Sequence, residues 1–439
     1  MNEAFRTERD SLGPVSVPRE RLYGAQTARA VANFPISGVS IATLPHLLTA
    51  LAEVKIAAAL ANRDEGSLAP EKAEVIIAVC REIVAGRHRE EFVVDVFQGG
   101  AGTSTNMNMN EVVANLASLR LGGPVGAERV IHPNDEVNRS QSTNDAYATA
   151  ARLSMVRASR EVQRSLSELV EALRRKAEEF AAIPKLGRTQ LQDAVGMTLG
   201  QEFGAFATTI GEDVSRLAEA EKLFLEINLG GTAIGSGVAA GAVYREHVLE
   251  HLREVTGLAV VPASDLFEAS WDMGAFMLQS GLLKRTAAKL SKIANDLRLL
   301  SSGPYGGFGE IRLPALQPGS SLMPGKVNPV AAEALNQVCF HVYGLDTTVG
   351  MAAEAGQLQL NAMEPVIVYS LHQGMGLLST AVRTFIRTCV NDIRPDTERC
   401  QSNLAGSSAF ATELVTSIGY EAAAKLVMDR AGGGHPDVS

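Results

Sequence analysis

"STNDAYATAARLSMVRASREVQRSLSELVEALRRKAEEF", residues 142–180, is the stretch that decides the fold of this chain. It lies in a longer run, residues 134–183, that contains neither glycine nor proline. Apolar side chains recur at steps of three and four residues, which is the spacing of an amphipathic helix: Val162, Leu166, Leu169, Leu173, Ala177 and Phe180. At about 1.5 Å per residue, the run predicts a helix of roughly 60 Å or more, far longer than an ordinary globular helix.

Four further stretches show the same helical pattern, at residues 197–228, 265–301, 329–355 and 363–388. Five long helices with apolar stripes predict an elongated bundle. Residues 41–120 predict shorter helices interrupted by glycines. We therefore expect a mainly α fold with three domains: an N-terminal, mostly helical domain (1–138), a central five-helix bundle (139–393) and a small C-terminal domain (394–439) that ends in a disordered tail, "AGGGHPDVS".

Composition excludes several classes of partner. The chain has 40 basic and 49 acidic residues, and its net charge of −9 argues against a nucleic acid or an anionic membrane as partner. Its four cysteines form no C-x-x-C pair and predict no disulfide framework. The N-terminus is polar, and we find no run of about 18 apolar residues that would span a membrane. We expect a cytoplasmic protein.

Three segments combine hydroxyl, amide and backbone donors near the start of a predicted helix. The first, from Gln98, contains Thr103, Ser104 and Thr105; the second, from His132, contains Ser142, Thr143 and Asn144; the third is "PGSSLMPGKVNP", residues 318–329. Ordinary helix capping explains one hydroxyl at each helix start, but each segment carries more hydroxyls than one cap uses. Donors at helix N-termini attract anions, so together the segments predict a binding site for carboxylates.

The third segment resembles a phosphate-binding loop only superficially. Gly319 and Gly325 enclose five residues, one more than in the P-loop motif, and Val327 follows Lys326 where that motif has Ser or Thr. A carboxylate is the better match for this loop. We expect Asn328 to cap the next helix and Pro329 to take its first position.

Two other segments match motifs of known binding sites, one for zinc and one for a dinucleotide, but each has a simpler structural explanation. "HVLEH", His247 to His251, fits the zinc-peptidase signature H-x-x-E-H, but the histidines flank an apolar stripe in a charged sequence, and we favour an ordinary boundary helix. "GSGVAA", from Gly235, fits G-x-G-x-x-A, but its surroundings are helical instead of alternating between strands and helices. We expect a glycine-rich connection there and no nucleotide.

Beyond these local patterns, the chain resembles the aspartase/fumarase superfamily. "GSSLMPGKVNP" is similar to the family signature G-S-S-x-M-P-x-K-x-N-P, and further blocks match in the family's order: "QGGAGTSTNMNMNEV", "SQSTNDAY", "GRTQLQDAVGMTLGQEF" and "QLQLNAMEPVI". The likeness runs from about residue 8 to about residue 425. It implies a homotetramer whose core combines the five-helix bundles of its subunits, with each active site built from three subunits. It also implies reversible elimination from a small dicarboxylate to give fumarate, without an organic cofactor; we assign no metal-binding residues to the site, and activation by a divalent metal stays open.

The resemblance also assigns roles to residues. Ser320 corresponds to the base that removes a proton next to a carboxylate, and donors aimed at the resulting charge supply a large catalytic term. Thr103, Ser142, Thr143 and Ser321 correspond to those donors. Lys326 and Asn328 correspond to the anchor of the substrate's other carboxylate. A serine acts as a base only if its alkoxide is stabilised, and we expect backbone N–H groups of the loop, Lys326 and the helix start to do so.

Gln190 indicates which group leaves the substrate, ammonia or water. Related fumarases usually have histidine at this position. Hydroxide benefits from a proton donor whereas ammonia leaves without one, so a glutamine that cannot titrate favours ammonia loss. With Thr189 and Asn144, Gln190 can accept hydrogen bonds from an ammonium group. "MEP" at Met363 and Val330 after "NP" also favour aspartate as the substrate. A fumarase, or a lyase acting on a substituted aspartate, remains the alternative.

Two departures from the family pattern bear on these expectations. Gly196 stands where the family usually has proline, which loosens the local backbone. We also expect the third domain to be shorter than in members of that family. A catalytically silent protein on this fold, as among lens crystallins, is a further alternative, but the expected site residues are all present in the sequence.

Overall fold

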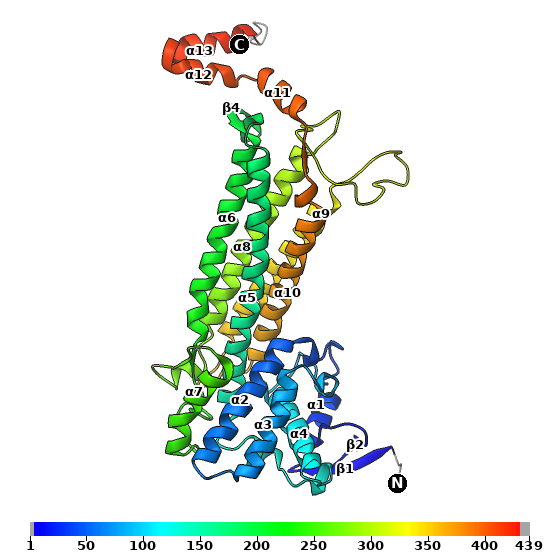
Figure 1. The fold of residues 1–439 in the computed structure, drawn as a ribbon, viewed down its shortest axis with the longest axis vertical. Helices are drawn as coiled ribbons and strands as arrows, with labels where there is room; N and C mark the ends of the chain where they lie inside the picture. The colour runs from blue at the N-terminus through cyan, green and yellow to red at the C-terminus, as the bar shows by residue number, and fades with distance from the viewer. Residues whose placement is uncertain (1–3, 431–439) are drawn as a thin grey trace. The chain divides into compact units, whose positions relative to one another are not determined.

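The computed structural model describes residues 4–430 and is mainly helical, as expected (Figure 1). The chain divides into two compact units. Unit 1 contains residues 1–162, 216–283 and 342–376, and unit 2 contains residues 163–215, 284–341 and 377–439. The long helices contribute to both units, so the three-domain division drawn from the sequence stays a prediction. The expected tail, 431–439, lies outside the described residues.

The five long helices predicted from periodicity are confirmed. They are α5 (Thr143–Glu179), α6 (Leu199–Ala220), α8 (Gly274–Leu300), α9 (Val330–Glu354) and α10 (Glu364–Thr388). Helix α5 begins at Thr143, whereas the glycine- and proline-free run begins at residue 134. A short π-helical turn, Pro133–Val137, and the left-handed conformation of Ser140 (φ 59°) interrupt the chain before it. Periodicity therefore located this helix, while local side-chain bonds set its start.

Unit 1 also holds helices outside the long set: α1 (Ala25–Asn33), α2 (Pro45–Asp64), α3 (Pro70–Val84), α4 (Thr103–Arg120) and α7 (Ala242–Thr256). Helix α2 packs against α3, α4 and α7 (Figure 1). Ala50, Ala57 and Ala61 of α2 are fully buried, and such small side chains let neighbouring helices approach closely. Polar contacts in the same unit join α5 to α10 through Ser154 and His372.

Unit 2 contains the remaining lengths of the five long helices, and its core is aromatic where α5 ends. Phe180 and Phe203 meet edge to face with ring centroids 5.2 Å apart. A side chain at Gly200 of α6 would lie 2.4 Å from the Ala177 carbonyl, so glycine lets α6 approach α5. Unit 2 ends with α11 (Thr397–Ala405), α12 (Ala409–Ile418) and α13 (Tyr420–Arg430).

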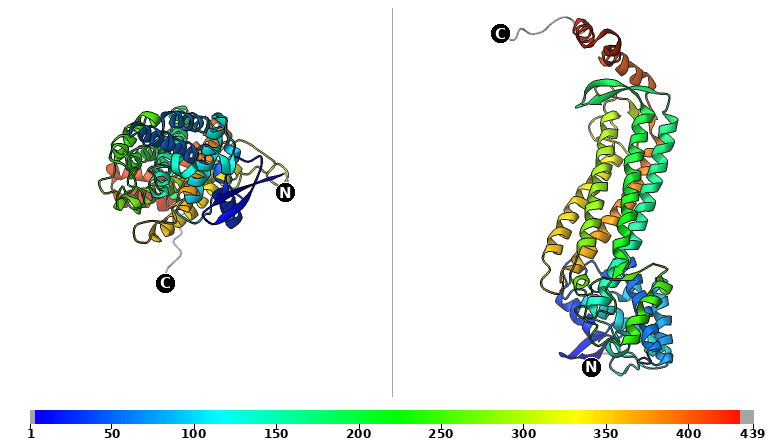
Figure 2. Two further views of the ribbon diagram at one scale, coloured as in Figure 1. Left: turned by 90° about the horizontal axis from the view of Figure 1, so that it is seen from below. Right: turned by 90° about the vertical axis from the view of Figure 1, so that its left-hand side faces the viewer.

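The strands form short two-stranded ladders that helical periodicity did not predict. They are β1 (Phe5–Asp10) with β2 (Gly13–Pro18), β3 (Pro184–Thr189) with β4 (Gln192–Thr198), and β7 (Ile311–Arg312) with β8 (Arg394–Pro395), all antiparallel, and β5 (Glu226–Ile227) with β6 (Val261–Pro262), parallel. Figure 2 shows the β3–β4 hairpin in green where the chain passes from α5 to α6. Gly196 lies in β4 opposite Leu186, in extended backbone. Single-turn helices complete the fold: Ile41–Thr43, Arg89–Glu91, Gly126–Glu128, Glu221–Phe224, Glu268–Ser270 and Val390–Asp392.

The "GSGVAA" segment lies in the loop between β5 and α7. A side chain at Gly235 would lie 2.4 Å from the Leu266 backbone, so close packing accounts for this glycine. The loop starts after a strand of only two residues, not after the longer strand of a dinucleotide fold. Across residues 4–430, no helix is both long and apolar enough to cross a membrane.

Candidate active site

The residues expected at the site fall into two groups, each within one unit. Unit 1 contains Thr103, Ser142, Thr143 and Asn144, and unit 2 contains Thr189, Gln190, Ser320, Ser321, Lys326 and Asn328. Each group is built by different local interactions.

Helix α4 starts from a tight turn, Gly100–Gly102, in which every residue has positive φ. A side chain at Gly102 would lie 2.5 Å from the Tyr147 ring, so only glycine lets the turn rest on that ring. Thr103 is the exposed first residue of the helix, and its hydroxyl donates to the Gly100 carbonyl at 2.7 Å. Gln98 accepts hydrogen bonds from the backbone N–H and the hydroxyl of Thr105. Capping by Gln98 thus leaves Thr103 at the exposed start of the helix.

Helix α5 starts at a loop whose polar side chains are half-buried. The Ser142 hydroxyl accepts the Asn144 N–H at 3.2 Å, which makes Ser142 a helix cap. Asn106 of α4 donates its side-chain amide to the Thr143 hydroxyl at 3.1 Å. The Asn144 side chain donates to the Ala233 carbonyl at 2.8 Å. Asn106 of α4 therefore ties the first residue of α5 to α4, whose own first residue is Thr103.

A buried lysine holds the loop before α5. The Lys55 ammonium donates to the side-chain oxygens of Asn138 at 2.9 Å and Gln141 at 2.8 Å. The Asn138 oxygen also accepts from Asn106 and Asn110 at 3.0 and 3.1 Å. Sequence reasoning missed Lys55, although a lone lysine in the apolar run "LAEVKIAAALA" is a signal for a buried polar contact.

Asp145 fixes the same loop from the other side. Its carboxylate accepts the backbone N–H groups of Ser142, Gly230 and Thr232 at 2.9, 3.1 and 3.0 Å. Burial raises the pKa of Asp145 to about 6, although these hydrogen bonds and the charge of Lys55 oppose the shift. Burial likewise lowers the pKa of Lys55 to about 7, although the charge of Asp145 opposes this. The charge of each group therefore favours the charged form of the other.

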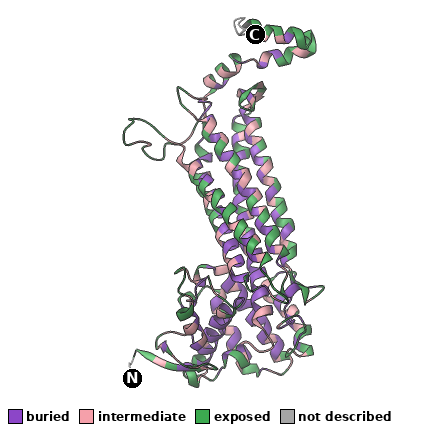
Figure 3. Cartoon of the chain, turned by 180° about the vertical axis from the view of Figure 1, so that it is seen from behind, coloured by how far each residue is buried: buried purple, intermediate pink, exposed green. Residues whose placement is uncertain are grey.

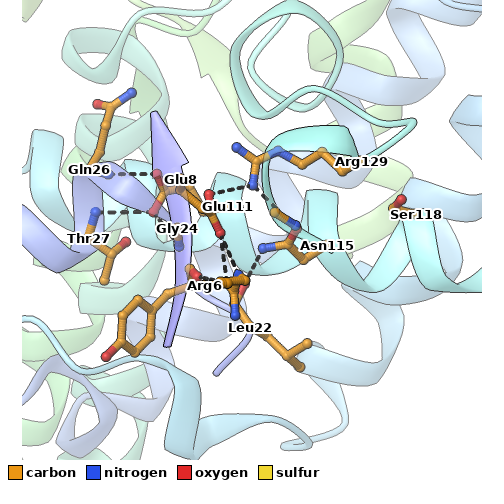
Figure 4. A network of polar contacts seen from close by, with 12 residues as sticks. Arg6, Glu8, Leu22, Gly24, Gln26, Thr27, Glu111, Asn115, Ser118 and Arg129 are labelled. Carbon is orange, nitrogen blue, oxygen red and sulfur yellow. Dashed lines mark hydrogen bonds and ion pairs between the residues drawn. The ribbon is translucent and has the colours of Figure 1, made fainter. Parts of the chain in front are cut away.

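The N-terminal hairpin is tied to α4 by a second polar network (Figure 4). Glu8 of β1 accepts from Arg6 and Arg129 at 2.9 and 3.0 Å. Glu111 of α4 accepts the backbone N–H groups of Gln26 and Thr27 in the first turn of α1. Because both carboxylates are buried and bonded, this network holds α4 in place.

In unit 2, Thr189 and Gln190 lie at the tip of the β3–β4 hairpin and are exposed. Gln190 and Leu191 both have positive φ, 55° and 62°, as in a two-residue type I′ turn. The base of the hairpin is fixed by Glu310, which accepts from Arg188 at 2.7 Å and lies 3.2 Å from the Lys185 ammonium. The turn thus presents the amide of Gln190 on a well-anchored hairpin.

The other expected site residues of unit 2 are Ser320, Ser321, Lys326 and Asn328. They lie on the loop between β7 and α9, which is mostly exposed (Figure 3). The loop closes on itself: the Gly319 N–H donates to the Lys326 carbonyl at 2.8 Å, and the Asn328 amide donates to the Gly319 carbonyl at 2.7 Å. A side chain at Gly319 would lie 2.4 Å from the Lys326 carbonyl oxygen. Asn328 therefore closes the loop, which differs from the helix cap expected, and α9 begins at Val330, one residue later than expected.

Ser320 occupies the inside of this closed loop. Its hydroxyl oxygen accepts the backbone N–H groups of Leu322 at 3.1 Å and Met323 at 2.9 Å. The residue lines a hollow of about 600 Å³, together with Lys326 and neighbouring loop residues. Ser321 and Lys326 are exposed on the same loop. Two N–H donors aimed at one serine oxygen are an arrangement that stabilises an alkoxide.

Comparisons with known proteins place the sequence of this chain in one family. The sequence model of a family described as "Lyase" matches residues 13–344. The aspartate ammonia-lyase of Pseudomonas fluorescens is 53% identical over 424 residues, which are 96% of this chain and 89% of that protein. The aspartate ammonia-lyase of Escherichia coli K12 is 48% identical over 421 residues, 96% of this chain and 88% of that protein.

Solved structures give the same result. A fumarate lyase:delta crystallin from Brucella melitensis, bound to cobalt, has a TM-score of 0.95 at 53% identity and covers 98% of this chain and 94% of its own. A class II fumarase from Schistosoma mansoni has a TM-score of 0.94 at 37% identity, covering 97% of this chain and 92% of its own. The chain therefore belongs to this lyase family, the aspartase/fumarase superfamily.

Proposed function

We propose that this carbon–nitrogen lyase catalyses the reversible deamination of L-aspartate to fumarate and ammonia. Relatives with the aspartate ammonia-lyase name are about half identical over nearly the whole chain. The observation that carries the chemistry is the Ser320 hydroxyl, which accepts two backbone N–H groups inside a loop that also bears Lys326.

In the proposed reaction, Ser320 is the base. Its alkoxide takes the proton from the carbon adjacent to the carbon that carries the amino group. The electron pair of that C–H bond moves into the neighbouring carboxylate and forms an enediolate. The pair then returns to form the carbon–carbon double bond, the C–N bond breaks, and ammonia leaves with that bonding pair. The Leu322 and Met323 N–H groups stabilise the alkoxide because they donate directly to its oxygen.

The remaining residues divide between the two carboxylates and the amino group of the substrate. Hydroxyls of Ser142, Thr143 and Ser321 donate to the carboxylate that becomes the enediolate. The Thr103 hydroxyl joins them by turning from the Gly100 carbonyl to the substrate. Lys326 and Asn328 bind the other carboxylate. Thr189, Gln190 and Asn144 accept hydrogen bonds from the ammonium group. The cluster at the starts of α4 and α5 supports this division because its hydroxyls lie at helix N-termini, which favour anions.

Loss of ammonia is favoured over loss of water by Gln190. It lies exposed at the hairpin tip, and its amide cannot donate a titratable proton to a departing hydroxide. The fumarase structure is also less similar in sequence, at 37% identity, than the aspartate ammonia-lyases at 48–53%.

We further propose a cytoplasmic homotetramer in which loops of three subunits complete each active site. Large apolar side chains are exposed on α8 and α9, among them Met277, Leu278, Phe340 and Met351. Apolar surface of this kind on long helices favours burial against other copies of the chain. The free, buried thiols of all four cysteines suit a reducing compartment. Light scattering on the purified chain measures the number of subunits directly.

The test of the mechanism is a Ser320→Ala variant beside wild type and a Ser215→Ala control, since Ser215 is an exposed serine on α6. Ser320→Ala should lower kcat for L-aspartate by at least about 10³-fold, because it removes the base while leaving the carboxylate-binding groups. Binding of fumarate, measured by calorimetry, should change much less. A variant with near-normal kcat would remove Ser320 from this role.

A further inference from the structure

The two histidines of "HVLEH" meet an aspartate that the sequence places far away. His247 and His251 lie one turn apart on α7, and Asp64 is the last residue of α2. The His251 Nε2 atom lies 2.7 Å from Asp64 Oδ2, and the His247 Nδ1 atom lies 3.7 Å from the same oxygen. One ligand atom from each of the three side chains lies within 4.8 Å of the others.

We propose that Asp64, His247 and His251 bind one divalent transition-metal ion, such as zinc. Two imidazoles and one carboxylate are a ligand set that zinc and neighbouring metals accept. The sequence alone favoured an ordinary boundary helix for the two histidines. The structure adds a third possible ligand, Asp64, from a second helix. The site is also separate from every residue placed in the proposed reaction.

The spacing suits a metal after a small adjustment. Zinc bonds to nitrogen and oxygen are about 2.0–2.1 Å long, so ligand atoms around a tetrahedral zinc lie about 3.4 Å apart. The two histidine–aspartate distances, 2.7 and 3.7 Å, fall on either side of that value. The His247 side chain is 37% exposed and that of Asp64 is 26% exposed, so an ion can reach the site from solvent.

A simple ion pair between Asp64 and His251 leaves one atom unexplained. His251 Nδ1 is buried and makes no hydrogen bond with any described residue. The nearest acidic atom is Glu254 Oε2, at 3.5 Å. If a metal takes Nε2, Nδ1 carries the proton and points it toward this carboxylate. Metal-binding histidines usually donate their second N–H in this way, and Glu254 would hold the His251 ring in position.

The two oxygens of Asp64 are already divided between two tasks. Oδ1 accepts hydrogen bonds from the Arg63 guanidinium at 3.0 and 3.2 Å. Oδ2 faces both histidines. Arg63 therefore orients the carboxylate without occupying the oxygen that would bind the metal.

A metal at this position would join the end of α2 to α7. The two helices already pack together, and the adjacent Glu65 accepts the Tyr244 N–H at 3.4 Å. Helix α2 also carries Lys55, which holds the loop before α5. An ion that binds only the folded chain raises its stability, so we assign the site a structural role. Glu250, the acidic residue of the H-x-x-E-H motif, is exposed and outside the cluster, so the site lacks the placed base of a zinc peptidase.

The test is calorimetric titration of zinc chloride into chelator-treated full-length protein, with circular dichroism to record folding and Tm. Wild type should bind one zinc per chain, and the matched control Glu250→Gln should bind it equally well. Asp64→Asn, His247→Ala and His251→Ala should each weaken binding by at least about 100-fold, and Glu254→Gln by about 10-fold, as for the loss of an outer partner. Zinc should raise the Tm of wild type and Glu250→Gln but not that of His247→Ala.

If another variant fails to fold, zinc binding by the His247→Ala variant still tests the proposal. His247→Ala removes a partly exposed side chain, so it is the variant that best separates metal binding from folding. Absence of saturable zinc binding to wild type would overturn the proposal. Unchanged affinity and stoichiometry in His247→Ala would overturn it as well.

Discussion

The two parts of the chain that carry the expected site residues are built in opposite ways. In unit 1, the starts of α4 and α5 are held by side chains from other segments: Asn106 joins them, Lys55 reaches the preceding loop from α2, and Asp145 accepts the N–H groups of Gly230 and Thr232. In unit 2, the loop at 318–328 is closed mainly by its own atoms. One region is a buried scaffold, whereas the other is an exposed loop.

The difference suggests a division of labour in the proposed reaction. A scaffold fixed by buried polar groups can hold hydroxyl donors in position before substrate arrives, which is the requirement for electrostatic catalysis. A loop held by few contacts can close over bound substrate and exclude water from the intermediate. We therefore expect damage to the scaffold to lower stability and activity together, and damage to the loop to lower activity alone.

The largest effect on stability should come from Lys55→Met. The variant leaves the Gln141 oxygen without its ammonium donor and the buried Asp145 without the nearby positive charge. Removal of one member of a buried charged set typically costs about 3–5 kcal/mol. Urea unfolding and fumarate release should both show the loss. The matched control, Lys72→Met, removes a partly exposed lysine paired with Glu136 and should cost at most about 1 kcal/mol. Equal effects of the two variants would contradict a scaffold role for Lys55.

A pair of glycine variants compares the two regions directly. Gly102→Ala would press a methyl group against the Tyr147 ring in left-handed backbone (φ 87°), which we expect to cost about 2–3 kcal/mol. Gly319→Ala would press a methyl group against the Lys326 carbonyl in the exposed loop. Both should lower kcat, but only Gly102→Ala should lower Tm by several degrees. A comparable drop in Tm for Gly319→Ala would show that the loop is also part of the scaffold.

A smaller effect should appear in acid, again in unit 1. Burial lowers the pKa of His372 from 6.5 to about 3, with a further contribution from His46. Between these values, the unfolded chain binds a proton that folded His372 does not bind, so stability falls as pH falls below 6.5. The loss amounts to about 2 kcal/mol at pH 5. His372→Phe keeps the size of the side chain and should lose this part of the pH dependence. Parallel stability–pH curves for variant and wild type between pH 7 and 5 would contradict the buried neutral state.

The sequence predicted the secondary-structure elements better than it predicted the contacts between residues. Periodicity located the long helices because each has a continuous apolar stripe, as at Leu166, Leu169 and Leu173 of α5. The β3–β4 hairpin was missed because its turn residues, Gln190 and Leu191, lack the Asn-Gly or Asp-Gly signal of such turns. The family motifs named the candidate residues, and the structure adds the loop closure by Asn328.

The supporting residues were harder to predict because they come from distant parts of the chain. Lys55 meets Gln141 across 86 residues, and Asp64 meets His251 across 187 residues. Nothing in a local motif records such a pairing. A lone lysine in an apolar helix signals that a partner exists but not which one it is.

The most direct test of the central claim is the rate of fumarate formation by wild-type protein from L-aspartate, L-malate and an N-substituted aspartate, followed by ultraviolet absorbance. The account predicts that L-aspartate reacts at least about 100-fold faster, in kcat/KM, than either of the others, because Gln190 serves an ammonium group and supplies no proton to hydroxide. Fumarate from L-malate with none from L-aspartate would contradict it.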